Sequence, residues 1–236
     1  MKNIPVLYED EKFLILNKPA GLPVQGGSGI KVSLDTLLGE RYKDRPLLIH
    51  RLDKDTSGVI VTAKTREAAA ECSAFFSNPQ SGLIKTYLAL CAGKMGKRGV
   101  INEKLFIRGK ENHAQTSYKR LFLIPKLPLS NTGDEDFVPV SIMEIQPSTG
   151  RMHQIRRHFS FQGNPILGDD KYGDFALNKK LKIVPGKRRL LLHAYSIYLP
   201  PPLIKNGLKI TAPLPDYFRE IAERSEEKLP PLLCSM

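Results

Sequence analysis

The sequence predicts an α+β fold in which a mostly antiparallel β-sheet carries flanking helices. Short apolar segments bounded by turn-forming residues recur along the chain and lie close together, which is typical of strands that pair with their sequence neighbours. Fewer segments show the three- to four-residue apolar spacing of amphipathic helices. The sequence contains no internal repeat and no linker long enough to force a domain boundary, so we expect residues 1–236 to form a single domain.

The predicted strands are short apolar runs that end at charged residues or at Gly, Asn or Pro. They cover residues 6–8, 13–16, 46–49, 58–63, 84–90, 116–124, 138–146 and 190–199. The first two flank an acidic turn and therefore predict a hairpin. Residues 125–137, rich in Pro, Asn, Gly and Asp, predict a flexible insertion to which we assign no chemistry.

The predicted helices are marked by capping residues and by one apolar face. Ser33 suits the N-cap of a short helix, and Thr65 suits the N-cap of a longer one that ends before Pro79. Residues 150–161 predict a helix with Met152, Ile155 and Phe159 inward and arginines elsewhere, and residues 216–225 predict a last helix.

The net charge of +12 is concentrated in the middle of the chain. Residues 61–190 hold 22 Lys and Arg against 11 Asp and Glu. A concentrated excess of this kind indicates a polyanionic partner, of which nucleic acid is the commonest. The alternative is a solvated surface that only keeps the protein soluble.

The cysteines and the N-terminus indicate a soluble, cytoplasmic protein. Cys72, Cys91 and Cys234 lie far apart, which disfavours a disulfide framework and a thiolate zinc site. His153 and His158 are five residues apart, which is not the same-face spacing of a metal-binding helix, so we expect no metal. No apolar signal core follows the N-terminus, and no run approaches the roughly 18 apolar residues of a membrane span.

Residues 50–58, His-Arg-Leu-Asp-Lys-Asp-Thr-Ser-Gly, form a charged connection between two predicted buried strands. A connection held at both ends can present a carboxylate in a fixed direction. The alternative is a polar turn whose Asp and Thr side chains bond their own backbone. Asp53 and Asp55 would share a face on an extended backbone, but a glycosidase needs its carboxyl groups on either side of the scissile bond, so we disfavour a paired-carboxylate site.

Residues 150–161 bring many cationic groups onto one predicted helix. These groups are Arg151, His153, Arg156, Arg157 and His158. Their repulsion would weaken an isolated helix, so we expect an anionic partner, either a carboxylate such as Asp53 or a phosphate backbone. The alternative is an exposed basic face.

Residues 50–58 resemble the signature of the RluA-type RNA pseudouridine synthases: His-Arg-Leu-Asp, a variable residue, Asp or Pro, then Thr-Ser-Gly. Other segments resemble further motifs of that family and lie in the family's order. They are residues 17–21, 85–87, 150–158, 165–173 and 192–194. The resemblance runs from about residue 6 to residue 215, and it implies the pseudouridine synthase fold with a central RNA-binding cleft.

The resemblance implies an enzyme that isomerises uridine in RNA. The glycosidic bond to nitrogen breaks, the uracil turns and carbon 5 bonds to the ribose, with no cofactor or metal. Asp53 is implied as the catalytic carboxylate, which either forms a covalent adduct or assists removal of a ribose proton. Tyr87 is implied to stack on the target base and is a candidate general base, and Arg156 is implied to pair with Asp53 and keep it ionised.

The remaining cationic residues of these motifs are expected to contact RNA. Arg51 is implied to fill the space left by the flipped uridine, which would offset part of the unstacking cost of a few kcal/mol. The other expected RNA contacts are His50, Arg151, His153 and Arg157. We expect a monomer with no membrane association.

The substrate and the class of protein each have alternatives. The segment 172–193 looks nearest to the ribosomal members, so we expect large-subunit ribosomal RNA, with transfer RNA as the alternative. Because strands are predicted almost from Met1, we expect no counterpart of the basic N-terminal RNA-binding domain of many relatives, which leaves the target open. A non-catalytic RNA-binding or ribosome-assembly protein is disfavoured because Asp53, Tyr87 and Arg156 are all present. A nucleoside or glycoside hydrolase would release free base.

Overall fold

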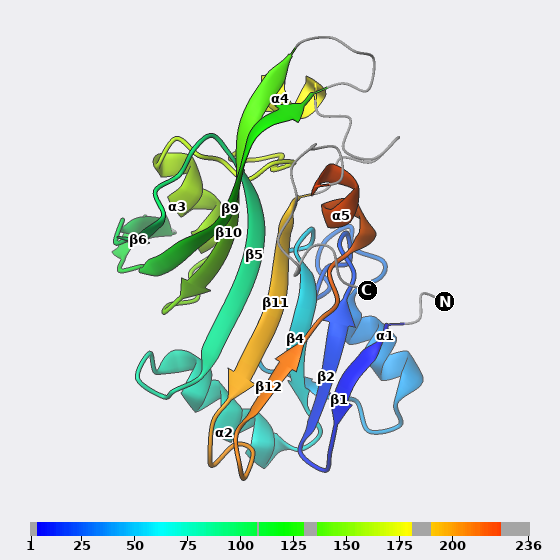
Figure 1. Cartoon of the computed structure of the whole chain (residues 1–236). Coiled ribbons are helices and arrows are strands. Elements are labelled where there is room, and N and C mark those ends of the chain that lie inside the picture. Colours follow the sequence, from blue (N-terminus) through cyan, green and yellow to red (C-terminus); the bar gives the residue numbers. More distant parts are fainter. Residues whose placement is uncertain (1–3, 108, 130–135, 181–189, 223–236) are drawn as a thin grey trace. The chain divides into compact units, whose positions relative to one another are not determined.

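The computed structural model describes residues 4–107, 109–129, 136–180 and 190–222, which form two compact units. The first unit comprises Met1–Thr86 and Ala194–Pro213, and the second comprises Tyr87–His193 with the residues from Leu214 onward. The chain therefore passes between the units within β5 (Ile84–Ala92), within β11 (Leu192–Leu199) and again after Pro213. Figure 1 labels both strands.

The first unit is a sheet with the strand order β1-β2-β4-β11, in which β3 also pairs with β4 and β12 with β11. Its elements besides β11 are β1 (Val6–Glu9), β2 (Phe13–Lys18), α1 (Leu34–Arg41), β3 (Leu47–Leu48), β4 (Ser57–Ala63), α2 (Arg66–Ser77) and β12 (Leu208–Thr211). The pairs β1–β2, β2–β4, β3–β4 and β11–β12 are antiparallel. The predicted hairpin is confirmed, whereas the predicted strand 46–49 is reduced to two residues.

Apolar side chains of α2 pack on this sheet and form its core. Every residue of β4 is buried, and Ala68 and Cys72 of α2 belong to the same cluster as β4, β2 and β12 side chains. The helix starts where expected because the Thr65 hydroxyl accepts a hydrogen bond from the Ala68 N–H at 3.1 Å. At α1, Ser33 forms a capping box with Thr36.

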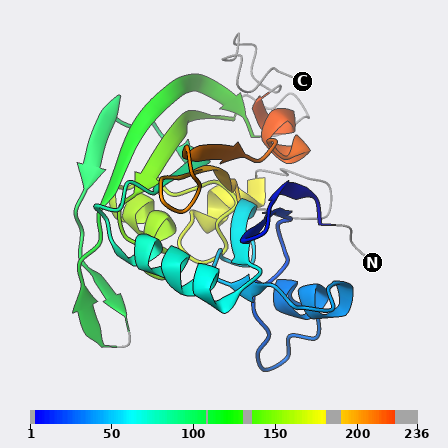
Figure 2. The same ribbon diagram turned by 90° about the horizontal axis from the view of Figure 1, so that it is seen from below.

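The second unit has the strand order β5-β10-β9-β6, with β5–β10, β10–β9 and β9–β6 all antiparallel. Its elements besides β5 are β6 (Arg98–Ile101), β7 (Leu105–Ile107), β8 (Lys110–Asn112), β9 (Thr116–Pro128), β10 (Phe137–Pro147), α3 (Gln154–Phe161), α4 (Phe175–Lys180) and α5 (Asp216–Ala222). Figure 2 shows the long curve of β9 and β10 in green. Both units thus confirm the predicted α+β class with antiparallel pairing.

The predicted insertion 125–137 contains strand residues at both of its ends. β9 runs to Pro128 and β10 starts at Phe137, so only residues 130–135 of this segment lie outside the described residues. Pro125, one of the prolines that suggested a loop, lies where the β9–β10 register shifts: Leu127 pairs with Val138 and Ile124 with Val140, so Pro125 and Lys126 lie opposite Pro139. A bulge tolerates a residue that cannot donate a ladder hydrogen bond.

The helix predicted over residues 150–161 is shorter in the structure, and its buried side chains differ from those expected. α3 begins at Gln154, after His153, which has φ 52° in the left-handed region. Met152, expected inside, is 50% exposed, whereas Arg156 is 5% exposed. The expectation that the arginines all face outward is therefore wrong. The predicted last helix extends to Ala222 in the described residues, and its expected end at 225 lies outside them.

Candidate active site

The loop between β3 and β4 carries the predicted catalytic Asp53. Its carboxylate is half-buried, while Leu52, Thr56 and Ser57 on either side are buried. The N–H of Thr56 donates to the Asp53 carbonyl oxygen at 3.2 Å, which closes a tight turn. The connection therefore contains a tight turn that is closed by backbone groups and begins at Asp53.

Lys18, at the end of β2, binds a backbone carbonyl group of this loop and two of the segment that follows β2. Its Nζ donates to the carbonyl oxygens of Pro19, Leu22 and Lys54 at 3.0, 2.8 and 2.9 Å. The Lys54 oxygen also accepts from the Gly21 N–H at 2.9 Å. Residues 17–21 matched a family motif in the sequence without an assigned role, and the structure gives them this one: they anchor the loop that carries Asp53.

The Lys18 ammonium is also an electrostatic neighbour of the loop's carboxylates. Burial lowers the pKa of Lys18 to about 7, and the negative charges of Asp55 and Asp53 oppose that shift. The three carbonyl acceptors match the three N–H bonds of an ammonium group, which is the charged form.

His50, predicted to contact RNA, stacks on an aromatic ring and accepts a hydrogen bond within the protein. Its ring stacks on Phe76 with centroids 4.4 Å apart, and its Nε2 accepts the Val61 N–H at 3.0 Å. Burial, followed by the nearby charge of Lys85, lowers the pKa of His50 to about 3, so the ring is neutral at pH 7. These contacts stabilise the start of the loop, and no separate observation supports the RNA contact.

Tyr87 lies on β5 of the second unit, where it pairs with Ile145 of β10 and is half-buried. The segment that precedes the acidic loop 169–172 runs beside the same strand. The N–H of Leu167 donates to the carbonyl oxygen of Leu90 at 2.9 Å, and Cys91 and Ile166 form an isolated antiparallel bridge. This pairing fixes where the acidic loop begins relative to the strand of Tyr87.

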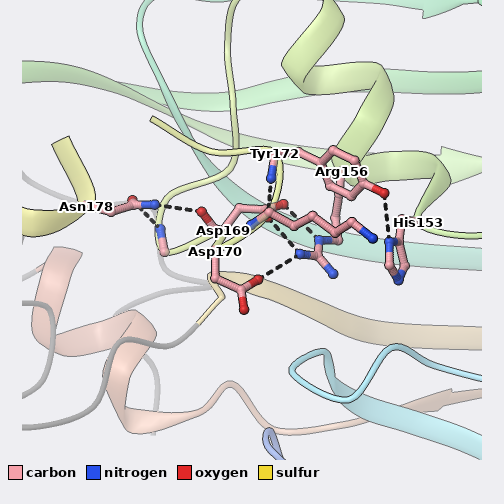
Figure 3. A network of polar contacts seen from close by, with 8 residues as sticks. His153, Arg156, Asp169, Asp170, Tyr172 and Asn178 are labelled. Atoms are coloured by element: carbon pink, nitrogen blue, oxygen red, sulfur yellow. Dashed lines mark hydrogen bonds and ion pairs between the residues drawn. The ribbon is translucent and has the colours of Figure 1, made fainter. Parts of the chain in front are cut away.

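Arg156 is bound by the acidic loop, as Figure 3 shows. Its Nε donates to Oδ2 of Asp169 at 2.8 Å and its Nη2 donates to Oδ1 at 2.7 Å, a two-pronged ion pair. The same Nη2 lies 3.1 Å from Oδ1 of Asp170. The guanidinium carbon is 5.3 Å from the centroid of the Tyr172 ring, at cation–π distance. The anionic partner expected for the basic segment therefore includes Asp169, which lies in residues 165–173, a segment that resembled a family motif without an assigned role.

The Arg156–Asp169 pair is buried on both sides, with 6% and 1% of the side-chain surfaces exposed. Burial alone would raise the pKa of Asp169, but hydrogen bonds from Arg156 and from the backbone N–H groups of Tyr172 and Lys171 bring it below its ordinary value. Asp169 is thus ionised at neutral pH and Arg156 is held by a full negative charge.

The other cationic residues of the segment 150–158 divide into structural and accessible groups. Buried His158 contacts the Thr116 hydroxyl and the Glu103 carbonyl oxygen at 2.9 and 3.0 Å, and burial lowers its pKa. Arg151 is exposed, and Arg157 and His153 are half-buried. His153 Nδ1 is 3.0 Å from the Tyr172 hydroxyl, so the acidic loop contacts both His153 and Arg156.

The predicted pairing of Arg156 with Asp53 joins residues of different units and stays a prediction, as does the position of Tyr87 relative to both. Within the described ranges, no group of three or more His, Cys, Asp or Glu side chains is arranged to hold a metal ion. None of the helices in those ranges combines the length and the apolar character needed to cross a membrane.

Comparison with known proteins gives consistent matches. The family model for RNA pseudouridylate synthase matches residues 12–161. A Haemophilus ducreyi protein called Ribosomal large subunit pseudouridine synthase C is 37% identical over 92% of this chain and 67% of its own length. Proteins of the same name from Rickettsia typhi and Vibrio vulnificus are 35% and 32% identical over 90% and 92% of this chain, and 69% and 68% of their own lengths.

Solved structures give the same fold. Human RNA Pseudouridylate Synthase Domain Containing 4 is 26% identical, with a TM-score of 0.72 over 95% of this chain and 94% of that one. Human RNA Pseudouridylate Synthase Domain Containing 1 superposes with a TM-score of 0.71 over 91% of this chain and 84% of that one. The motif-bearing loop, the fold and these matches agree with one another. The chain belongs to the RNA pseudouridylate synthase family of isomerases.

Proposed function

We propose that this protein converts uridine to pseudouridine in large-subunit ribosomal RNA. The observation that carries the proposal is the identity of 32–37% along 90–92% of the chain to relatives named Ribosomal large subunit pseudouridine synthase C. Those names favour a ribosomal substrate over transfer RNA, the alternative that the sequence left open. In the reaction the N1–C1′ bond breaks, a C5–C1′ bond forms, carbon 5 loses a proton and N1 gains one, so atoms and electrons balance without an oxidant.

Asp53 is the proposed catalytic carboxylate. Its loop is tied through the Lys54 carbonyl to Lys18 and Gly21, so the direction of the carboxylate is set before RNA binds. Both routes, covalent addition to the ribose and removal of a ribose proton, require the ionised form.

Arg156 is the proposed partner of Asp53 and Tyr87 is the proposed stacking residue and general base. Asp169 and Asp170 accept hydrogen bonds from Nε and Nη2 of Arg156, which hold its guanidinium in the second unit. An arginine keeps its charge at every physiological pH, which suits a permanent partner for a catalytic carboxylate. The half-buried position of Tyr87 leaves part of its ring available to a base.

The proposed RNA contacts are the accessible cations of the motifs. Arg51 and Arg151 are exposed, and His153 and Arg157 are half-buried. We further infer that residues 1–236 act as one catalytic domain with RNA in a cleft, as a monomer in the cytoplasm. The absence of net oxidation or hydrolysis supports a reaction without a cofactor.

The test is a map of pseudouridine in all cellular RNA, made by carbodiimide labelling of cells with and without the gene. We expect at least one large-subunit site to disappear, to return with wild-type protein and to stay absent with Asp53→Asn. A lost site in transfer RNA alone would contradict the ribosomal substrate. Full rescue by Asp53→Asn would contradict the catalytic role and favour a non-catalytic RNA-binding protein.

Two further variants separate the roles of the site residues. If Tyr87→Phe retains near-normal turnover, the ring stacks and the hydroxyl is dispensable; loss of turnover makes the hydroxyl the general base. Arg156→Ala is expected to lose far more turnover than RNA affinity. Equal losses would make Arg156 a phosphate contact.

A further inference from the structure

We propose that Asp169 is a positioning residue for pseudouridine formation, which acts by fixing the guanidinium of Arg156. The inference rests on the proposed function and adds a residue to it. It is carried by the geometry of the acidic loop, residues 169–172, in the second unit (Figure 3).

The contact between Asp169 and Arg156 sets a direction as well as a charge. Two parallel bonds of 2.8 and 2.7 Å join both carboxylate oxygens to Nε and Nη2. A fork of this kind fixes the plane of the guanidinium, whereas a single contact would leave it free to rotate about the Cδ–Nε bond. Because one carboxylate binds both Nε and Nη2, Asp169 sets the orientation of the whole guanidinium.

Asp169 is itself held so firmly that it can serve as a fixed point. Its Oδ1 also accepts the N–H groups of Lys171 and Tyr172, both at 2.9 Å. Asn178 donates to its carbonyl oxygen at 2.7 Å and accepts the N–H of Gly168 at 2.9 Å. A side chain at Gly173 would overlap the same carbonyl oxygen, so the loop closes tightly around Asp169.

Tyr172 extends the same support to a second motif residue. Its ring lies against the Arg156 guanidinium and its hydroxyl is 3.0 Å from Nδ1 of His153. His153 adopts a left-handed backbone conformation, which persists in a non-glycine residue only when its surroundings fix it. One loop thus orients both the arginine assigned to the chemistry and the histidine just before α3.

A purely structural ion pair would show the same distances, so the test must separate orientation from stability. Asp169→Asn keeps the shape but loses one of the two acceptor oxygens of the fork. Asp169→Glu keeps the charge but moves it outward by one methylene. Asp170→Asn is the matched control, because Asp170 contacts the same Nη2 at 3.1 Å while 75% of its side chain is exposed.

The readout is single-turnover release of tritium from a large-subunit ribosomal RNA transcript labelled at carbon 5 of uridine. A displacement of about 1 Å at a reacting group can cost about 100-fold in rate, and we expect Asp169→Asn to lose about that much while RNA affinity changes less than about threefold. Asp169→Glu should recover thermal stability but not rate. Asp170→Asn should lose no more than about threefold, in line with an exposed pair.

A double mutant shows whether Asp169 acts through Arg156. In an Arg156→Lys background, the fork is already broken, so adding Asp169→Asn should cost less than about threefold. A full second 100-fold loss would overturn the inference. So would an Asp169→Asn protein that melts earlier but turns over at the wild-type rate while folded, since that is the behaviour of a structural ion pair alone.

Arginine side-chain NMR gives a readout that needs no substrate. In protein labelled with ¹⁵N-arginine, we expect the Nε proton of Arg156, identified by its loss in Arg156→Lys, to exchange slowly in the wild type and rapidly in Asp169→Asn. Rapid exchange in the wild type would overturn the inference. If the Nε proton exchanges slowly in the wild type but the wild type releases no tritium, the proposed function is contradicted. The contact by which Asp169 orients Arg156 would still be supported.

Discussion

Gly58 ends the motif of residues 50–58 and lies in β4, and its replacement by alanine tests why a glycine stands in the Thr-Ser-Gly motif. Gly58 has φ 109°, and a Cβ built there would overlap the carbonyl oxygen of Ala194 on β11 and lie 2.7 Å from the carbonyl carbon. Backbone strain at such an angle costs about 1–3 kcal/mol, and overpacking against atoms that cannot rotate away costs about 1–3 kcal/mol more. We expect Gly58→Ala to lower the free energy of unfolding by about 2–6 kcal/mol.

Gly21→Ala is the matched control in the same unit. Gly21 has φ 83°, so alanine there bears similar strain, but no atom lies within 4 Å of its built Cβ. In equilibrium urea unfolding, Gly58→Ala should therefore be less stable than Gly21→Ala by about 1–3 kcal/mol, the overpacking cost alone. Equal denaturation midpoints for the two variants would refute the close approach of β4 and β11. Because Gly58 pairs with Lys18 in the β2–β4 register, we also expect the folded Gly58→Ala protein to turn over more slowly.

Three further predictions concern charge. The folded pKa of Lys18, about 7, lies below its ordinary 10.5. Between pH 7 and 10.5 the unfolded chain therefore binds more protons than the folded one. The free energy of unfolding of the wild type should rise with pH in this range by up to about 1.4 kcal/mol per pH unit. Urea unfolding of Lys18→Met should lack this slope. His50 is neutral when folded, with a pKa of about 3, so wild-type stability should fall as pH drops below 6.5, and less steeply in His50→Phe. Arg151→Gln should reduce the salt dependence of RNA binding by about one phosphate contact, measured by fluorescence anisotropy; an unchanged slope would place Arg151 away from the RNA.

Elements with local signals could be predicted closely from the sequence. The N-caps Ser33 and Thr65 lie where a side chain can bond the next turn, and both helices begin one residue later. The extent of β9 could not be predicted, because its prolines resemble a loop until the bulge beside Pro139 is known. Bulges depend on the partner strand, which a local pattern does not contain.

The candidate site was predicted only where a motif named a residue. Asp53, Tyr87 and Arg156 came from the family resemblance, whereas Lys18 and Asp169 were not singled out. The hydrogen bonds of Lys18 to Lys54 and of Arg156 to Asp169 span 36 and 13 residues, so no short window contains both partners. A signal was nonetheless present at both positions: Lys18 directly follows a buried strand, and Asp169 lies between Gly168 and Gly173 in a tight loop.

The basic segment 150–158 shows why a sum of charges misjudges an RNA-binding motif. His158 is buried with a lowered pKa, and the charge of Arg156 is offset by Asp169 at 2.7 Å. The cations that remain accessible are Arg151, Arg157 and partly His153. We therefore propose that the exposed residues of the segment contact phosphate, while its buried residues make contacts within the protein. Because a guanidinium already neutralised by a carboxylate attracts phosphate weakly but still donates directed hydrogen bonds, Arg156 is better suited to orient Asp53 than to hold RNA.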